Sequence, residues 1–181
     1  GTFDGNGFTI SNLSITNTDA SEALGFVNFA RGATLQSVTL VDAVVSGFNF
    51  VGGLVGSDSG SSSIKASSLS GSVMARGSHA GGLVGRASGT QIVNSFSLAS
   101  VTGSTYVAGL VGDNRSAGTE IVNSYVAGPL SVSDDRQPIV GSIIAFGSDA
   151  GIIDSVWNSS IAADVDRENG LARTSAQMKR Y

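Results

Sequence analysis

The side chains suited to acid-base chemistry are few in this chain. It holds one histidine, His79, and no cysteine among its 181 residues, so a Ser-His-Asp triad would have to use His79. No nucleophile-elbow motif accompanies this residue, and the surrounding segment RGSHAGG is rich in turn-forming residues. We therefore predict an exposed turn histidine rather than a catalytic base.

A pair of carboxylates is the more serious catalytic candidate. Asp58 and Asp113 each follow a copy of the same motif, Gly-Leu-Val-Gly, and glycoside chemistry uses two carboxyl groups about 5 to 10 Å apart. Arg86 stands near the related place after the copy in between. An Asp-Arg-Asp row of surface ion pairs is the competing interpretation, and we favour it over a catalytic pair.

The motif before these residues belongs to a repeat. Gly-Leu-Val-Gly begins at Gly53, Gly82 and Gly109, in steps of 29 and 27 residues. A second motif, seen as TISNLSI near the start and as QIVNSFS further on, recurs over six segments. Its aliphatic positions form one column: Ile10, Leu35, Ile64, Ile92, Ile121 and Ile152. Six coils of a repeat architecture are therefore predicted.

The elements that must position the candidate residues are short β-strands. The repeated motifs are rich in β-branched and aliphatic residues and are bounded by Gly, Ser, Asn and Asp, with no sustained helical period. Strands that return at this spacing pair best in parallel with their copies in the next coil. The sequence therefore predicts a parallel β-helix, or β-solenoid, with three short strands per coil. The repeat is too short for a β-propeller, whose blades need about 40 residues or more.

Composition narrows the function further. With 41% hydrophobic and 13% charged residues the chain should fold, and a net charge of −4 argues against nucleic acid or an anionic membrane as partner. No apolar run is long enough to insert into a membrane. The turn signals at Asp4-Gly5 and Asn6-Gly7 lack the carboxylates of a calcium loop. We expect no metal, no cofactor and no catalytic residue.

A polar column follows the aliphatic one by two positions. Period 2 along a strand would place it on the same, inward side. A row of ligands for a metal or another binding partner is one interpretation, and an internal hydrogen-bonded ladder, interrupted by Ala66, is the one we favour. The predicted ladder residues are Asn12, Asn94, Asn123 and Asp154. Thr90 and Thr119 also share a column, but two threonines are too few for an ice-binding row.

The repeated Gly-Leu-Val-Gly motif gives two further aliphatic columns. On a flat strand one of them would face outward, so the strand must bend, or the C-terminal tail must cover the outer column, or the column must dock a partner. We favour the first two explanations, in which the motif builds a buried seam. The predicted seam residues are Leu54, Val55, Leu83, Val84, Leu110 and Val111.

The chain changes character after the last repeat. We predict a solenoid over residues 1–158 and an exit segment over 159–181 of the same domain, where charged residues gather. Thr174 and Gln177 have the spacing of a capping box, so a short terminal helix is expected to cover the last coil. The chain has no initiating Met and starts directly on a repeat-like segment, as expected for part of a longer polypeptide.

These motifs resemble a known repeat. GGLVG followed by I-x-N-S, the opening GTFDGNGFTISNLSI and the ending NGLARTSAQM are similar to the GLUG-repeat segments of large bacterial secreted and surface proteins, including filamentous-haemagglutinin-like adhesins. The chain departs from the family at Ser95, Ser124 and Ser155, where Cys is frequent, and at GSIIAFG in the fifth coil.

The resemblance implies a role but no activity. It implies a secreted or cell-surface segment with flanking domains in the same polypeptide, which would present its repeat surface to a glycan or protein. It carries no catalytic residue over to this chain, so we expect a non-enzymatic structural or adhesive function. A fragment of a polysaccharide lyase or hydrolase is the alternative.

Overall fold

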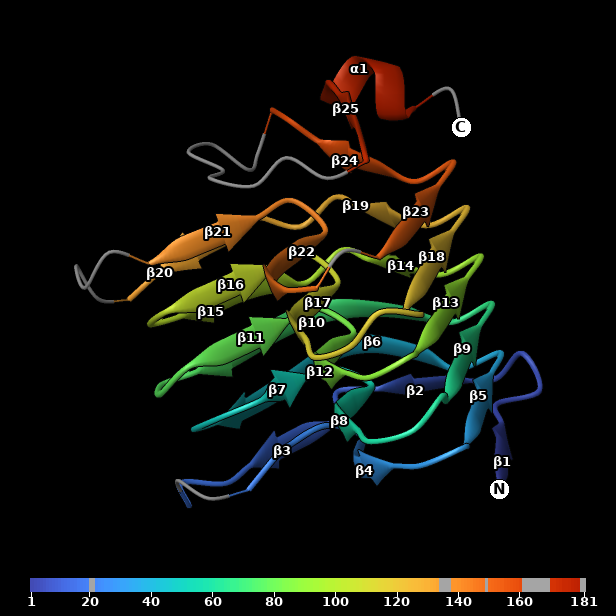
Figure 1. Ribbon diagram of the computed structural model, residues 1–181, viewed down its shortest axis with the longest axis vertical. Helices are drawn as coiled ribbons and strands as arrows, with labels where there is room; N and C mark the ends of the chain where they lie inside the picture. Colours follow the sequence, from blue (N-terminus) through green and yellow to red (C-terminus); the bar gives the residue numbers. More distant parts are fainter. Residues whose placement is uncertain (20–21, 134–137, 149, 161–169, 180–181) are drawn as a thin grey trace.

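The computed structural model describes residues 1–19, 22–133, 138–148, 150–160 and 170–179. Short strands from successive coils stack in parallel into a β-solenoid of about five turns (Figure 1). The predicted fold class is confirmed, although the solenoid has about five turns and not the six coils predicted. Each central coil contributes to four sheets rather than to three strand positions, because the Gly-Leu-Val-Gly motif is a corner between two strands and not one strand.

Sheet 1 carries the aliphatic column. Its residues pair in register from Leu35 to Ile64 and onward to Ile152, as predicted. The first position belongs to Phe3, which pairs with Leu35, whereas Ile10 lies in another sheet opposite Leu40. The sheet is built from β1 (Thr2–Asp4), β5 (Thr34–Gln36), β9 (Ser63–Lys65), β13 (Gln91–Val93), β18 (Glu120–Val122) and β23 (Gly151–Ile153).

Sheet 2 follows sheet 1 in each coil and holds the longest strands. Its members are β2 (Thr9–Ser11), β3 (Ser14–Thr16), β6 (Thr39–Gly47), β10 (Ser68–Ala75), β14 (Phe96–Ser97), β15 (Ser100–Gly103), β19 (Tyr125–Val126), β20 (Leu130–Val132), β24 (Val156–Asn158) and β25 (Leu171–Arg173). The solenoid begins in sheet 1 with β1 and ends in sheet 2 with β25. Sheet 1 therefore has six strands although the solenoid makes only about five turns.

Sheets 3 and 4 lie on either side of the Gly-Leu-Val-Gly corner. Sheet 3 consists of β7 (Val51–Gly52), β11 (His79–Gly81), β16 (Tyr106–Ala108) and β21 (Ile139–Gly141). Sheet 4 consists of β4 (Val27–Ala30), β8 (Val55–Asp58), β12 (Val84–Ala87), β17 (Val111–Asn114) and β22 (Ile144–Gly147).

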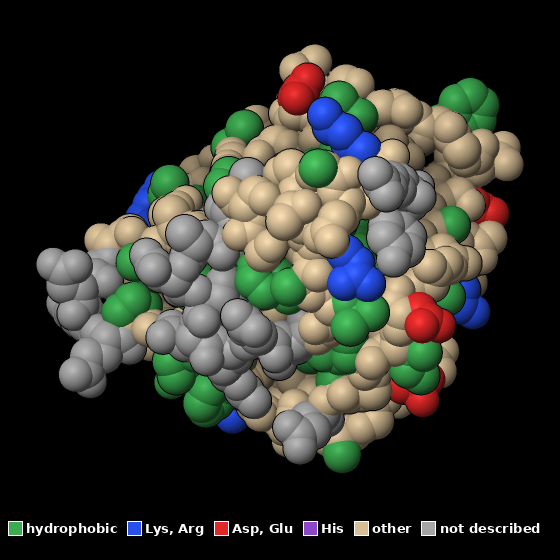
Figure 2. All heavy atoms as spheres, turned by 90° about the horizontal axis from the view of Figure 1, so that it is seen from above, with side chains coloured by type: hydrophobic (Ala, Val, Ile, Leu, Met, Phe, Trp, Pro, Cys, Tyr) green, Lys and Arg blue, Asp and Glu red, His purple; other side chains and the backbone are tan. Residues whose placement is uncertain are grey.

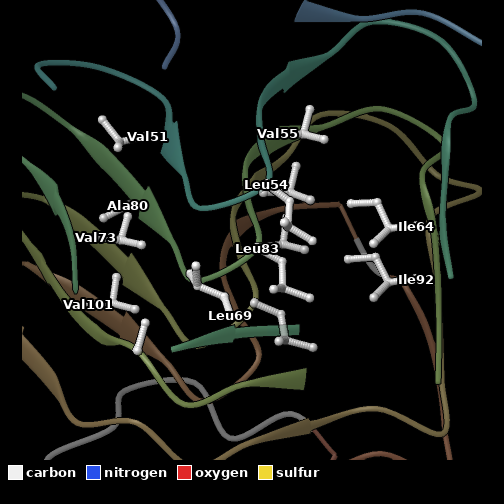
Figure 3. Packing of buried hydrophobic residues seen from close by; sticks show 14 of the residues in the cluster. Val51, Leu54, Val55, Ile64, Leu69, Val73, Ala80, Leu83, Ile92 and Val101 are labelled. Carbon is white, nitrogen blue, oxygen red and sulfur yellow. The ribbon is translucent and has the colours of Figure 1, made fainter. Parts of the chain in front are cut away.

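The corner turns both aliphatic columns of the motif into the core. The six predicted seam residues are each at most 1% exposed, so the seam is confirmed and the bend explains it. Figure 3 shows Leu54 and Leu83 between Val51 and Ala80 on one side and Ile64 on the other. A Cβ atom at Gly52 would overlap the carbonyl oxygen of Val55, so only glycine permits a turn this tight.

The predicted inward Asn ladder is wrong. Asn94, Asn123 and Asp154 are exposed and have φ angles of 51°, 48° and 48°, which turn the chain at a left-handed corner and end the strand's two-residue alternation. Asn12 has the same conformation but follows β2, outside this column. The amides of Asn94 and Asn123 do bond each other, at 2.6 Å, on the surface.

The internal polar ladder lies one residue later and is made of serine. Each hydroxyl donates to the carbonyl oxygen two residues before it and accepts an N–H from the preceding coil, for example Ser67 N–H to Ser95 Oγ at 3.1 Å. Every member is at most 2% exposed, and the members are Ser67, Ser95, Ser124 and Ser155. A small hydroxyl satisfies both partners inside the corner, as buried polar groups require.

The C-terminal segment covers the last coil. Its strand β25 pairs with β24, and α1 (Ser175–Met178) follows with the predicted capping box between Thr174 and Gln177. A Cβ atom at Gly170 would lie 2.6 Å from Ile143 Cδ1, so this backbone packs directly on the core. Residues 161–169 and 180–181 of the predicted exit segment lie outside the described residues. Viewed from this end, the described hydrophobic side chains form small separate groups (Figure 2).

Candidate functional site

Side chains from sheets 3 and 4 meet outside the Gly-Leu-Val-Gly corner and bring the candidate chemical groups together; we call this region between the two sheets the cleft. The Leu residue of each Gly-Leu-Val-Gly corner is buried in the core, and sheets 3 and 4 extend from this corner toward the surface. Their side chains then meet across the cleft, where Tyr106 from β16 and Phe146 from β22 have ring centroids 4.4 Å apart. Glycine allows the backbones of neighbouring segments to approach closely here, since a Cβ atom at Gly85 would overlap the backbone of Phe50.

His79 lies inside this cleft and not on an exposed turn, so that prediction is wrong. It begins strand β11, is 8% exposed, and stacks between Phe50 at 4.9 Å and Tyr106 at 4.6 Å. Its Nδ1 is 2.8 Å from Ser78 Oγ. Burial lowers the pKa of His79 to about 4, although the Asp113 carboxylate acts in the opposite direction. The imidazole is therefore neutral at neutral pH.

Asp113 is the centre of the charged cluster. Its side chain is fully buried, and its Oδ2 accepts hydrogen bonds from Arg115 Nε at 2.8 Å and Arg86 Nε at 3.3 Å. His79 Nε2 is 3.9 Å from the same oxygen. Burial and the neighbouring Arg115 charge lower the pKa of Arg86, whose guanidinium lies 3.3 Å from the centroid of Phe50. Two cations thus flank one carboxylate.

Asp58 is not part of this cluster. Strand register pairs Arg86 with Ser57 on one side and Asp113 on the other, so Asp58 is one residue beyond the charged column. It is 1% exposed and accepts hydrogen bonds from two backbone N–H groups and from the hydroxyls of Ser62 and Thr90. The predicted Asp-Arg-Asp surface row is wrong, because a shift of one residue changes the direction of a strand side chain.

The threonine column is also internal. Thr90 and Thr119 are both fully buried, and Thr119 Oγ1 donates to Asn114 Oδ1 at 2.7 Å. These hydroxyls therefore support the backbone and the buried polar groups next to them, and they do not form a surface row.

The cleft contains a Ser-His-Asp line that is poorly suited to hydrolysis. Ser78, His79 and Asp113 follow one another at 2.8 and 3.9 Å, but 3.9 Å is too long for a hydrogen bond. Asp113 Oδ2 already binds two arginines, and an imidazole with a pKa of about 4 is a weak general base at neutral pH. The arrangement holds the two sheets together.

A pocket of about 370 Å³ opens beside Asp113. Among the described residues, Asp113 Oδ1 is buried without a hydrogen-bond partner. The pocket is lined by Asp113, Asn114, Arg115, Phe146, Gly147 and Ser148. Sequence reasoning missed Arg115 and Phe146. The signal for Phe146 was the fifth coil's GSIIAFG, which departs from the repeated motif.

A second pocket, of about 590 Å³, lies between sheet 2 and the C-terminal helix. Its lining includes Asn123, Tyr125 and Met178, and the Tyr125 ring stacks on Phe96 at 4.6 Å. Within the described ranges, no cluster of three His, Cys, Asp or Glu residues could hold a metal ion. The same part of the chain contains no helix long and apolar enough to cross a membrane.

Comparison with known proteins supports the fold. The structure resembles the crystal structure of a putative immunoglobulin A1 protease from Bacteroides ovatus, with a TM-score of 0.70, 20% identity, and coverage of 98% of this chain and 70% of that one. A segment of 60 residues, 33% of this chain, is 40% identical to halomucin from Haloquadratum walsbyi but spans only 1% of that protein. No protein-family model matches the chain.

Proposed function

We propose that this chain is a non-enzymatic β-solenoid segment of a large exported protein, of the GLUG-repeat type, which acts as a rigid scaffold or adhesive surface. The observation that carries the proposal is that the candidate acid-base groups, both in the cleft and inside the solenoid, are already engaged by other protein groups. Asp58 is saturated by internal donors, Asp113 lies between two arginines, and His79 is neutral and stacked. These engagements argue against proton transfer to a substrate.

The comparisons fit a module within a longer polypeptide. The matched segment is 1% of halomucin, so similar sequence occurs inside a very large protein. Parallel stacking gives a stiff body whose terminal coils can join neighbouring domains. The partners that we propose are flanking domains of the same polypeptide and a cell-surface glycan or protein, with no nucleic acid and no membrane insertion. We propose a secreted or cell-surface location.

A hydrolase is the second candidate. It is supported by the name of the Bacteroides ovatus protein and by the Ser78-His79-Asp113 line. For a glycan substrate, this candidate would be a polysaccharide-acting enzyme. The interatomic distances and the low pKa of His79 argue against it.

Turnover and binding assays separate the two candidates. The 181-residue chain is incubated with a polysaccharide panel and with immunoglobulin A1, and it is also applied to a glycan array and to cells. We expect binding without product formation. Turnover that disappears in Ser78→Ala or His79→Phe, while Phe29→Ala retains it, would overturn the proposal.

A further inference from the structure

We propose that the pocket beside Asp113 binds a pyranose residue of a glycan through two adjacent hydroxyl groups, with Asp113 and Arg115 as polar contacts and Phe146 as the apolar one. This inference rests on the proposed adhesive function and deepens it by naming a site and a ligand class.

The first argument is the unpaired oxygen of Asp113. The side chain is fully buried, and Oδ1 has no hydrogen-bond partner in the described part of the chain. A buried acceptor without a partner is costly, so a ligand that donates a hydrogen bond to it gains affinity. Because Oδ1 is closed to solvent in the free chain, the exposed side chains at the rim must shift when the ligand binds. Because Oδ2 already accepts from Arg115 at 2.8 Å and Arg86 at 3.3 Å, the charge is compensated and a neutral hydroxyl is sufficient.

The second argument is Arg115, which lies at the rim. Its side chain is 55% exposed and reaches Asp113 through Nε. A guanidinium has five N–H groups in a fixed plane, so donors remain for a ligand oxygen next to the one that contacts Asp113. A sugar's adjacent hydroxyls match this pair, because one can donate to the carboxylate while its neighbour accepts from the guanidinium.

The third argument is the ring of Phe146. It is 38% exposed, and its contact with Tyr106, at 4.4 Å between centroids, holds it at the pocket. An exposed aromatic surface provides a contact for the C–H face of a pyranose. The volume of about 370 Å³ lies within the range of ligand pockets, roughly 300 to 1,000 Å³.

The charges select among possible ligands. Among the described residues at the pocket, Arg86 and Arg115 outnumber Asp113, and His79 is neutral at neutral pH. The local excess of one positive charge opposes an ammonium or metal ion and favours a sugar that carries a carboxylate. We therefore expect uronic acid oligosaccharides to bind more tightly than neutral hexose oligosaccharides.

Calorimetric titration of the whole chain tests the site. The probes are a uronate oligosaccharide and a neutral hexose oligosaccharide of equal length. Phe146→Ala and Arg115→Gln alter exposed side chains and should each weaken binding about tenfold or more, the loss expected for one contact to a charged or aromatic group. The controls are Phe29→Ala and Arg31→Gln, which alter exposed residues at the other end of the solenoid.

The outcomes distinguish this inference from the proposed function. Equal affinity of Phe146→Ala, Arg115→Gln and the unaltered chain for the same glycan would overturn the pocket and leave an adhesive surface elsewhere. Absence of binding to both probes also overturns the pocket, whereas adhesion to cells or to a protein partner in that case would retain the proposed function. Turnover of the probe would overturn the proposed function itself.

Discussion

Asp58 and Asp113 are both buried carboxylates just after a Gly-Leu-Val-Gly corner, yet their surroundings differ completely. Asp58 is inside the solenoid and receives four hydrogen bonds from neutral donors. Asp113 is in the outer cleft, where two arginines share one of its oxygens and the other oxygen has no partner in the described chain. The first arrangement is complete by itself, whereas in the second the oxygen without a partner belongs to a residue that lines a pocket.

The difference follows from a shift of one position along a strand. Asp113 pairs in register with Arg86 and Phe146, and its neighbour Asn114 is the residue that corresponds to Asp58. Asn114 keeps the role of Asp58 two coils later, since it is fully buried and is bonded by Thr119, while Ala87 occupies this place in the coil between them. The polar residues of this interior column stabilise the fold, whereas Arg86 and Asp113 of the adjacent column contribute to the cleft.

The largest effect that we expect comes from removing Asp58. Asp58→Ala leaves the Ser62 and Thr90 hydroxyls and two N–H groups without their acceptor. Several unsatisfied buried donors should lower the free energy of unfolding by about 3 kcal/mol or more, as measured by urea denaturation.

The matched control is Asp58→Asn. An amide keeps the shape and one acceptor oxygen, and Asn114 already fills the equivalent place in a later coil. We expect a smaller loss of about 1 to 2 kcal/mol, because the hydroxyl that faces the new NH2 group can reorient to accept, whereas the backbone N–H on that side loses its acceptor. Equal losses for Ala and Asn would show that the hydrogen-bond network is not what makes Asp58 stabilising.

The contribution of the cleft around Asp113 to stability should depend on pH, because His79 lies in this cleft. Burial lowers the pKa of His79 from 6.5 to about 4, so between these values the unfolded chain binds a proton that the folded chain does not. The free energy of unfolding therefore falls as the pH decreases. We expect His79 to account for about 2 kcal/mol of stability lost between about pH 7 and pH 5.

The variant His79→Phe isolates this contribution. Phenylalanine retains an aromatic ring between Phe50 and Tyr106 but does not titrate. Unfolding curves at several pH values should show that the variant loses less stability on acidification than the unaltered chain. Identical pH dependence would mean that His79 gains its proton as easily when folded as when unfolded.

Much of the fold could be predicted from the sequence because the repeat is strict where the core is formed. The column from Leu35 to Ile152, the buried Leu-Val seam and the terminal capping box all follow from spacing and residue type. The number of strands per coil could not be predicted, since the motif that looks like one strand is a corner. Its angle is set by contacts between glycines and the backbone of neighbouring strands.

The site was far less predictable. His79 and Asp113 are separated by 34 residues and lie in different sheets, so only the corner angle brings them to 3.9 Å. The inward direction of the Asp58 side chain results from a shift of one residue along the strand. The exposed position of the Asn column results from the positive φ angle of its residues. Periodicity gives no information on any of these three features.

The smallest effect that we expect is at the exposed Asn column, and it tests the corner interpretation directly. Asn94 has a φ angle of 51°, is exposed, and accepts one hydrogen bond from Asn123. Ala66 holds the same corner at 46° without an amide, so the amide is dispensable. Asn94→Gly should change the free energy of unfolding by no more than about 0.5 kcal/mol, because glycine suits a positive φ angle and offsets the lost surface bond. Asn94→Val should cost about 1 to 2 kcal/mol, since a β-branched side chain is strained in this conformation. Urea denaturation of both variants decides the point: a glycine variant less stable than the valine variant would mean that the Asn94 amide, and not the backbone angle, determines the corner.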